Sequence, residues 1–167
     1  LTGLYTRQAF LRKADQIRKE NLRKRFCVMA FDFDNFKSSN TMYGEEKCNE
    51  FLAYTGRKLK GVLPKGIAGR FGGDQFILFF AYEGERVDVG RLNDLTSSIL
   101  AAAPIPHQVV KIGVNAPIDN KQSMVVCCDR AFLAIREIKG IYGKNLAFYE
   151  SKLQKQLLDE QRIIETM

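Results

Sequence analysis

The sequence of 167 residues has no tryptophan and a single histidine, His107, which we expect to be structural. One histidine leaves too few partners for a multi-imidazole zinc site or a serine–histidine–aspartate triad. The four cysteines form no CxxC pair and three of them lie in apolar segments, so we expect buried, reduced thiols. The chain also lacks an apolar run of membrane-spanning length and any signal-peptide pattern, so we expect no membrane contact by this domain.

The overall composition, with 46% hydrophobic and 27% charged residues, predicts one soluble globular domain with a sizeable core. The formal net charge is +7, and much of it comes from the early segment RKADQIRKENLRKR. A basic balance fits polyanionic ligands such as nucleotide phosphates, although the same segment also fits a solvated helix face. Because the chain opens on Leu1 inside a helix-like pattern, we expect it to be part of a longer protein.

Apolar spacing predicts an alternation of helices and strands with a hairpin near the middle. The segment FCVMAFDF (26–33) is apolar on both alternating faces, which predicts a central strand buried on both sides. We expect Asp34 to cap a following short helix and Gly140 to occupy the C′ position of a later one. The expected elements are helices at 6–25, 45–62, 88–102, 123–139 and 151–167, strands at 67–71, 75–82 and 146–150, and a further strand within 104–117. This order predicts an α+β fold with a mostly antiparallel central sheet flanked by helices.

The stretch GRFGGDQF (69–76) places a carboxylate, Asp74, at a glycine turn between two strands. Asp32 lies near the end of the buried strand, where an uncompensated carboxylate is costly. If these strands are neighbours, the two acids converge at one sheet edge and suit Mg²⁺ that carries a nucleotide phosphate. The alternative is that Asp32 is a helix-capping acid and Asp74 is only a turn acid.

Two further polar groups could serve such a ligand. Lys37 and Asn40 lie one helical turn apart beyond Asp32, where they could contact a phosphate and a base edge, or form a solvated face. The segment GIYGKN (140–145) could clamp a phosphate, or simply end a helix and turn. The sequence contains no Walker A pattern.

These segments occur together in an order that resembles a known family. LTGLYTRQAF (1–10), FDFDNFKSSNTMYG (31–44), RFGGDQF (70–76) and GKN (143–145) resemble the GGDEF domain, the diguanylate cyclase family that joins two GTP molecules into cyclic di-GMP. The resemblance implies a palm-like nucleotidyl-cyclase fold, with a GGDEF domain over residues 1–150. Residues 151–167 resemble an amphipathic linker to a following EAL phosphodiesterase domain.

The resemblance also implies roles for individual residues. It assigns Mg²⁺ (or Mn²⁺) binding to Asp32, the backbone carbonyl of Phe33 and Asp74. Gly72 and Gly73 would admit the phosphates, while Asn40 and the residue at position 49 would contact guanine. The implied phosphate contacts are Lys37, Lys144 and Arg136, with Lys139 as the alternative to Arg136 because the segment before Gly143 is longer than usual.

The sequence departs from the family pattern at positions that matter for catalysis. Gln75 replaces the acid that helps to hold metal and is thought to activate the attacking 3′-hydroxyl, and an amide cannot act as a general base. Asn49 replaces a guanine-binding acid and loses one of two acceptors. Glu45 replaces a histidine and Thr41 an aspartate. The family's inhibitory Arg-x-x-Asp site reads LPKG (63–66) here, so we expect that site to be absent.

We therefore expect a degenerate GGDEF domain in bacterial cyclic di-GMP signalling. It would be cytoplasmic, bind GTP with Mg²⁺, regulate an attached EAL domain and have weak or no cyclase activity. The alternative is an active diguanylate cyclase, which would need a homodimer because each protomer supplies one GTP. A remote alternative is an RNA-binding module, since RFGGDQFILFF resembles an aromatic RNA-recognition strand, but Asp74 would repel phosphate and we expect no nucleic acid partner.

Overall fold

The structure, a computed structural model, describes residues 4–34, 36–62, 66–101, 103–106 and 108–150. The helix expected at 151–167 and the structural role expected for His107 lie outside the described residues, and the LPKG segment lies largely outside them. Among the helices within these ranges, none has the length and apolarity that crossing a bilayer requires.

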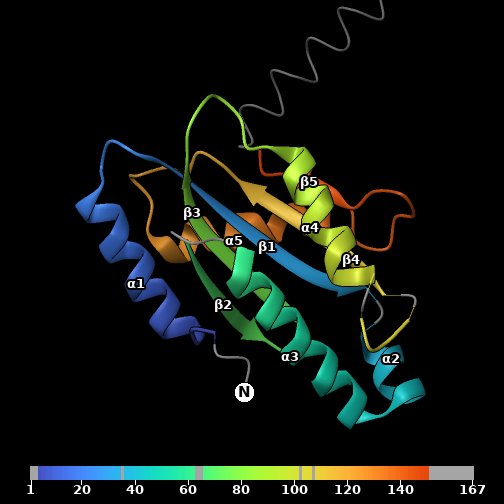
Figure 1. Cartoon of the computed structure of the whole chain (residues 1–167). Coiled ribbons are helices and arrows are strands. Elements are labelled where there is room, and N and C mark those ends of the chain that lie inside the picture. Colours follow the sequence, from blue (N-terminus) through green and yellow to red (C-terminus); the bar gives the residue numbers. More distant parts are fainter. Residues whose placement is uncertain (1–3, 35, 63–65, 102, 107, 151–167) are drawn as a thin grey trace, which may run out of the picture.

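A five-stranded sheet forms the centre of the fold, with the strand order β2-β3-β1-β4-β5 (Figure 1). The strands are β1 (Arg25–Asp34), β2 (Ile67–Gly72), β3 (Gln75–Tyr82), β4 (Val109–Asn115) and β5 (Leu146–Phe148). β1 pairs antiparallel with both β3 and β4, β2 pairs antiparallel with β3, and β4 with β5 is the parallel pair. The predicted α+β fold with a mostly antiparallel sheet is confirmed, and so is the hairpin.

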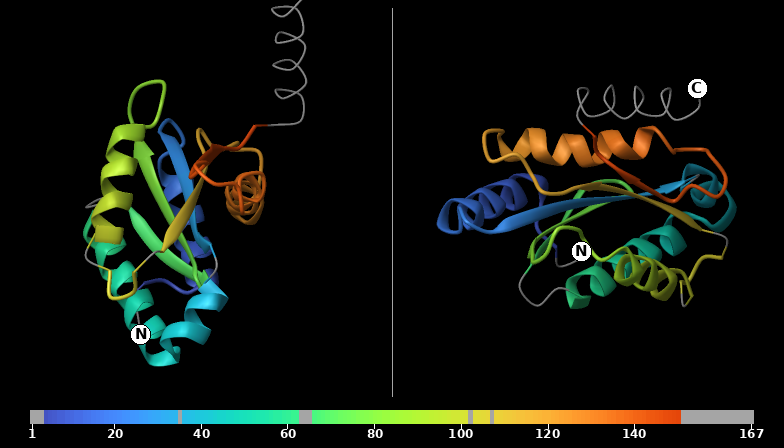
Figure 2. Two further views of the ribbon diagram at one scale, coloured as in Figure 1. Left: turned by 90° about the vertical axis from the view of Figure 1, so that its right-hand side faces the viewer. Right: turned by 90° about the horizontal axis from the view of Figure 1, so that it is seen from above.

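Helices cover both faces of this sheet, as the view from above in Figure 2 shows. The helices are α1 (Arg7–Glu20), α2 (Phe36–Tyr43), α3 (Glu45–Val62), α4 (Val89–Ala101) and α5 (Met124–Arg136). Alternate β1 residues enter two separate cores: Met29, Phe31 and Phe33 pack on the α3–α4 side. Val28 and Ala30 pack on the α1–α5 side. This explains why β1 is apolar on both alternating faces and confirms that it is central.

Close packing of α5 on β4 fixes where α5 ends relative to the sheet. A Cβ atom on Gly113 of β4 would lie 2.0 Å from the backbone carbonyl oxygen of Ala131, so only glycine allows this approach. Asn115 Nδ2 also donates a hydrogen bond of 3.0 Å to the Cys127 carbonyl. The segment after α5 is thereby brought toward the β1 end that carries the acidic residues.

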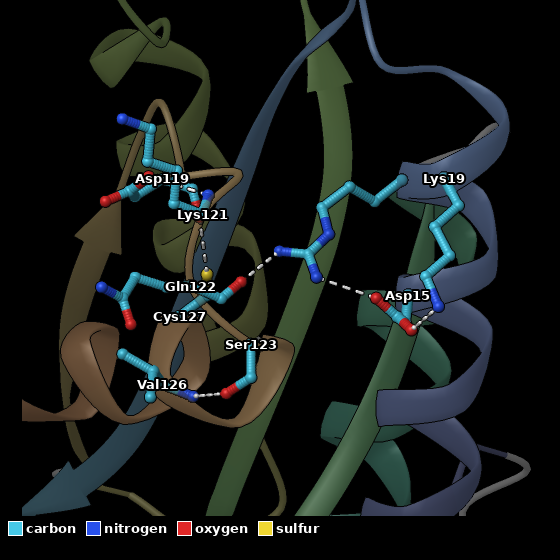
Figure 3. Close-up of polar contacts among 9 residues, drawn as sticks. Asp15, Lys19, Asp119, Lys121, Gln122, Ser123, Val126 and Cys127 are labelled. Carbon is cyan, nitrogen blue, oxygen red and sulfur yellow. Dashed lines mark hydrogen bonds and ion pairs between the residues drawn. The ribbon is translucent and has the colours of Figure 1, made fainter.

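The basic segment of α1 is partly structural. Most of its lysines and arginines are exposed, as a solvated helix face requires, but Arg18 is buried. Arg18 donates hydrogen bonds to Asp15 at 2.8 Å and to the Gln122 carbonyl at 2.6 Å, which ties α1 to the loop before α5. Figure 3 shows Asp15 and Lys19 on α1 facing the loop that contains Gln122.

Several sequence-based details differ from the structure. α1 ends at Glu20 rather than near residue 25 because the cap residue Asn21 leaves the helical conformation. α5 begins after the predicted cap, Ser123, but ends at Arg136, so Gly140 is not its C′ residue. Gly140 instead adopts φ +78° in the following turn. Asp34 ends β1, and its Oδ1 atom has no hydrogen-bond partner, so the capping role predicted for it is wrong.

Buried free thiols were predicted, and the structure confirms them: the four cysteines are unpaired and buried.

Candidate functional site

The β2–β3 turn places the signature residues beside the end of β1. Gln75 is the direct register partner of Asp32 across the β1–β3 pair, so both side chains project from the same face of the sheet. That face is the one covered by α5, because Ile77 and Ala30, two residues along each strand, pack in the α1–α5 core. The position where the family has its second acid is therefore adjacent to Asp32, and it holds a neutral amide.

Asp74 and Asp32 converge as the sequence predicts. Burial, followed by the hydrogen-bonding and charge interactions with Asp32, raises the pKa of Asp74 to about 6. The interactions with Asp32 add to the effect of burial because two neighbouring carboxylates oppose each other's ionisation. The side chain of Asp32 is itself only 8% exposed.

The Lys139 ammonium faces this acidic pair. Its Nζ atom donates a hydrogen bond of 3.0 Å to Asp32 Oδ2, across 107 residues of sequence. This hydrogen bond, aided by the charges of Asp32, Asp74 and Asp34, raises the pKa of Lys139. Of Arg136 and Lys139, the two candidates for one phosphate contact, Lys139 is the residue whose side chain lies against Asp32.

A second lysine, Lys111, lies beneath the same acids and was missed by the sequence analysis. It is the β4 register partner of Asp32, and its side chain is 2% exposed. Lys111 Nζ lies 3.8 Å from Asp34 Oδ2 and donates hydrogen bonds to oxygens of the 140–145 segment. The acceptors are the carbonyls of Ile141 (2.8 Å) and Lys144 and the side chain of Asn145 (3.2 Å). A lysine inside the apolar run VVKIGVN was the available signal.

A cavity of about 430 Å³ opens on the other side of the glycine turn. Its lining comprises Phe36, Asn40, Thr41, Glu45, Asn49, Leu52, Arg70 and Gly73. It therefore brings together Asn40 and Asn49, the two residues expected to contact guanine. Arg70, which the sequence analysis did not single out, donates hydrogen bonds of 3.0 and 2.8 Å to the Gly73 carbonyl and so braces the turn.

The glycines of the turn join the cavity to the acidic pair. Gly72 and Gly73 have positive φ angles of 149° and 32°, and a Cβ at either would meet no atom within 4 Å. Their role is therefore conformational and leaves open space above the turn. A ligand that crosses this turn can reach both the amides of the cavity and the acids at the strand ends.

The other side chains predicted to contact phosphate are exposed and do not line the cavity. Lys37 on α2 is exposed and does not line the cavity. Arg136, the last residue of α5, is exposed. Lys144 is also exposed, while its carbonyl accepts a hydrogen bond from Lys111. Phe33 lies in β1 with its ring buried, next to Asp32.

The donor set suits a hard divalent cation that arrives with a phosphate. Asp32 and Asp74 supply two adjacent carboxylates, and Mg²⁺ commonly uses one or two carboxylates plus substrate phosphates and water. Within the described ranges no cluster of three or more histidine, cysteine, aspartate or glutamate side chains could hold a metal by itself. The residues therefore fit Mg²⁺ or Mn²⁺ as part of a nucleotide complex rather than as a closed protein site.

The raised pKa of Asp74 predicts how stability depends on pH in metal-free buffer. Between about pH 4 and pH 6 the folded state holds the proton of the Asp74 carboxyl more tightly than the unfolded state does. The stability that this protonation contributes is therefore lost as pH rises through that window. Asp74→Asn removes the carboxylate and is expected to be more stable than wild type at pH 7 by about 1 kcal/mol, after allowance for solvent screening. Thermal unfolding of both proteins from pH 4 to pH 7 measures the difference. A difference that does not grow with pH would contradict this prediction.

Comparison with known proteins agrees with this geometry. The sequence model described as "Diguanylate cyclase, GGDEF domain" matches residues 1–129. An uncharacterized protein, y4lL, of Sinorhizobium fredii is 26% identical over 98% of this chain and 21% of its own length. The diguanylate cyclase DgcM of Escherichia coli is 26% identical over 68% of this chain and 29% of its own length. The chain thus spans less than a third of either relative.

Solved structures show the same fold. The GGDEF domain of DgcB from Caulobacter crescentus, determined in complex with c-di-GMP, superposes with a TM-score of 0.77 at 22% identity, over 90% of this chain and 91% of that one. At this identity the likeness concerns the fold. Together with the family match over most of the sequence, it shows that this chain belongs to the GGDEF domain family.

Proposed function

We propose that this domain binds a guanine nucleoside triphosphate, GTP with Mg²⁺ or Mn²⁺, and acts in cyclic di-GMP signalling as a regulatory domain with weak or no cyclase activity. The observation that supports this most directly is the placement of Gln75 opposite Asp32, beside a retained acidic pair and an open cavity. Binding groups are present, while the general base of the family is replaced by an amide.

In this proposal each part of the site has one task. Asn40 and Asn49 hold the base in the cavity, and the Gly72–Gly73 turn lets the phosphates pass close to the backbone. Asp32 and Asp74, with the Phe33 carbonyl, hold the metal, which when bound neutralises phosphate charge. Lys144 and Lys37 contact the phosphates, as does either Arg136 or Lys139.

The assembly around the domain is also a proposal. Because the chain spans less than a third of the curated relatives that it matches, we infer that it belongs to a larger protein. The resemblance of residues 151–167 to the linker before an EAL domain supports an EAL domain as the attached partner. The domain would act in the cytoplasm, where GTP is available. That DgcB was determined in complex with c-di-GMP agrees with a place in the same signalling system.

A second candidate, an active diguanylate cyclase, is favoured by the retained Asp32 and Asp74. They could hold the metal while water serves as the base, and two protomers would then have to face each other. Incubation of the full-length protein with GTP and mass spectrometry of the product separates the two candidates, since only an active cyclase forms cyclic di-GMP.

Calorimetric titration with GTP, ATP and cyclic di-GMP, each with and without Mg²⁺, tests the proposed binding. We expect GTP with Mg²⁺ to bind and Asn40→Ala to weaken it, because an amide that lines the cavity is lost. Lys121→Met is a matched control, since Lys121 is exposed in the loop before α5. Absence of GTP binding at millimolar concentration contradicts the proposal.

A further inference from the structure

A protein cation lies on the acid to which we assign the metal. Lys139 Nζ is 3.0 Å from Asp32 Oδ2, while the side chain of Asp32 is 8% exposed and that of Lys139 is 53% exposed. The pair therefore stands at the border between the sheet and solvent, where an ion or a phosphate would enter. The same ammonium interacts electrostatically with Asp74 and Asp34, so it faces the acidic group as a bound cation would.

The fold fixes Lys139 in this place from both sides. On its N-terminal side, the backbone N–H groups of Ile138 and Lys139 donate to the Ile135 carbonyl, and Ile138 is buried. On its C-terminal side, Lys111 binds the carbonyls of Ile141 and Lys144 from beneath. The segment that holds Lys139 is therefore attached at both ends to buried structure.

The buried lysine of β4, Lys111, cannot take over this role. Lys111 uses its three donors on the 140–145 segment, and the carboxylate nearest to it is that of Asp34, at 3.8 Å. Asp32 is thus left to Lys139. A divalent cation at the Asp32 carboxylate would be repelled by the Lys139 ammonium, which lies 3.0 Å from Asp32 Oδ2.

We propose that Lys139 is a built-in competitor of the divalent metal at Asp32 and Asp74. Without nucleotide its ammonium neutralises Asp32 and keeps the affinity for free metal low. When a nucleotide brings metal and phosphate together, Lys139 leaves Asp32 for the phosphate. Metal and nucleotide binding are thereby coupled, because each favours the state in which the Lys139–Asp32 pair is open. This inference rests on the proposed assignment of Asp32 and Asp74 as the metal-binding pair.

Titration with Mn²⁺ alone, followed by the electron paramagnetic resonance signal of free Mn²⁺, tests this competition without nucleotide. We expect Lys139→Met to bind Mn²⁺ about tenfold more tightly than wild type. Lys139→Arg keeps the cation and should resemble wild type, as should Lys121→Met. The gain should disappear in the Lys139→Met/Asp32→Asn double variant. Circular dichroism checks that each variant is folded, as expected for a half-exposed side chain.

The outcomes separate this inference from the proposed function. Mn²⁺ affinity unchanged in Lys139→Met, a gain that survives loss of the Asp32 carboxylate, or no Mn²⁺ binding by either protein each overturn the competition. Failure of GTP to bind would contradict the proposed function. It would not affect the comparison of Mn²⁺ affinities between Lys139→Met and wild type, because that titration contains no nucleotide.

Discussion

Gln75→Glu is expected to raise the rate of cyclic di-GMP formation by about 10²–10⁴, the usual contribution of a positioned general base. Gln75 is the register partner of Asp32, so a glutamate there would put a carboxylate beside the acidic pair on the face covered by α5. A carboxylate can accept the proton of an attacking hydroxyl and bind metal, whereas an amide has no accessible pKa for proton transfer. Mass spectrometry of the product after incubation with GTP and Mg²⁺ measures the gain.

The control for this prediction is Gln75→Asn, which keeps an amide and should give no gain. If Gln75→Glu alone forms no cyclic di-GMP, Asn49→Asp is added to it, because Asn49 lines the cavity and lacks the second acceptor for guanine. The proposal that Gln75 is the main catalytic defect is contradicted if Gln75→Glu binds GTP as well as wild type and yet forms no product, either alone or combined with Asn49→Asp.

Lys111→Met is expected to lower the free energy of unfolding by about 3–5 kcal/mol, the cost of breaking a buried ion pair on one side. Methionine keeps the apolar stem but removes the ammonium from a side chain that is 2% exposed. Asp34, whose side chain is 11% exposed, would lose its nearest cation, and the carbonyls of Ile141 and Lys144 would lose a donor. Urea denaturation, followed by circular dichroism, measures the change.

A matched pair of variants isolates the cause of this loss. Lys121→Met, on an exposed lysine, should change stability by no more than about 0.5 kcal/mol. Adding Asp34→Asn to Lys111→Met removes the uncompensated charge and should recover part of the stability. A loss below about 1 kcal/mol in Lys111→Met, or no recovery in the double variant, would show that Lys111 is not the buried counter-ion that the structure indicates.

Local sequence patterns were most informative where one segment fixes its own geometry. The hairpin around GRFGGDQF follows from two apolar runs and a glycine turn, and the structure has β2 and β3 where the pattern places them. Ser123 caps α5 through a hydrogen bond to the Val126 N–H, which is also a local contact. The convergence of Asp74 on Asp32 needed only that two strands be neighbours.

Predictions failed where a distant partner decides the outcome. Asp34 looks like a helix cap in sequence, yet its carboxylate faces Lys111, a residue from β4. Gly140 looks like the residue that ends α5, but α5 ends earlier and Gly140 belongs to the turn above Lys111. A buried lysine within VVKIGVN has no local explanation, because its acceptors come from a segment about thirty residues later.

The sequence by itself determined the family, the antiparallel sheet with its glycine turn, and the replacement of an acid by Gln75. These depend on residue types and on the alternation of apolar side chains, which a single chain displays directly. Only the tertiary structure decided which cation meets Asp32 and which acids are compensated, because Lys139 and Lys111 reach the site through packing of α5 and β4. Charge pairing depends on distance in space, and a linear sequence does not contain that distance.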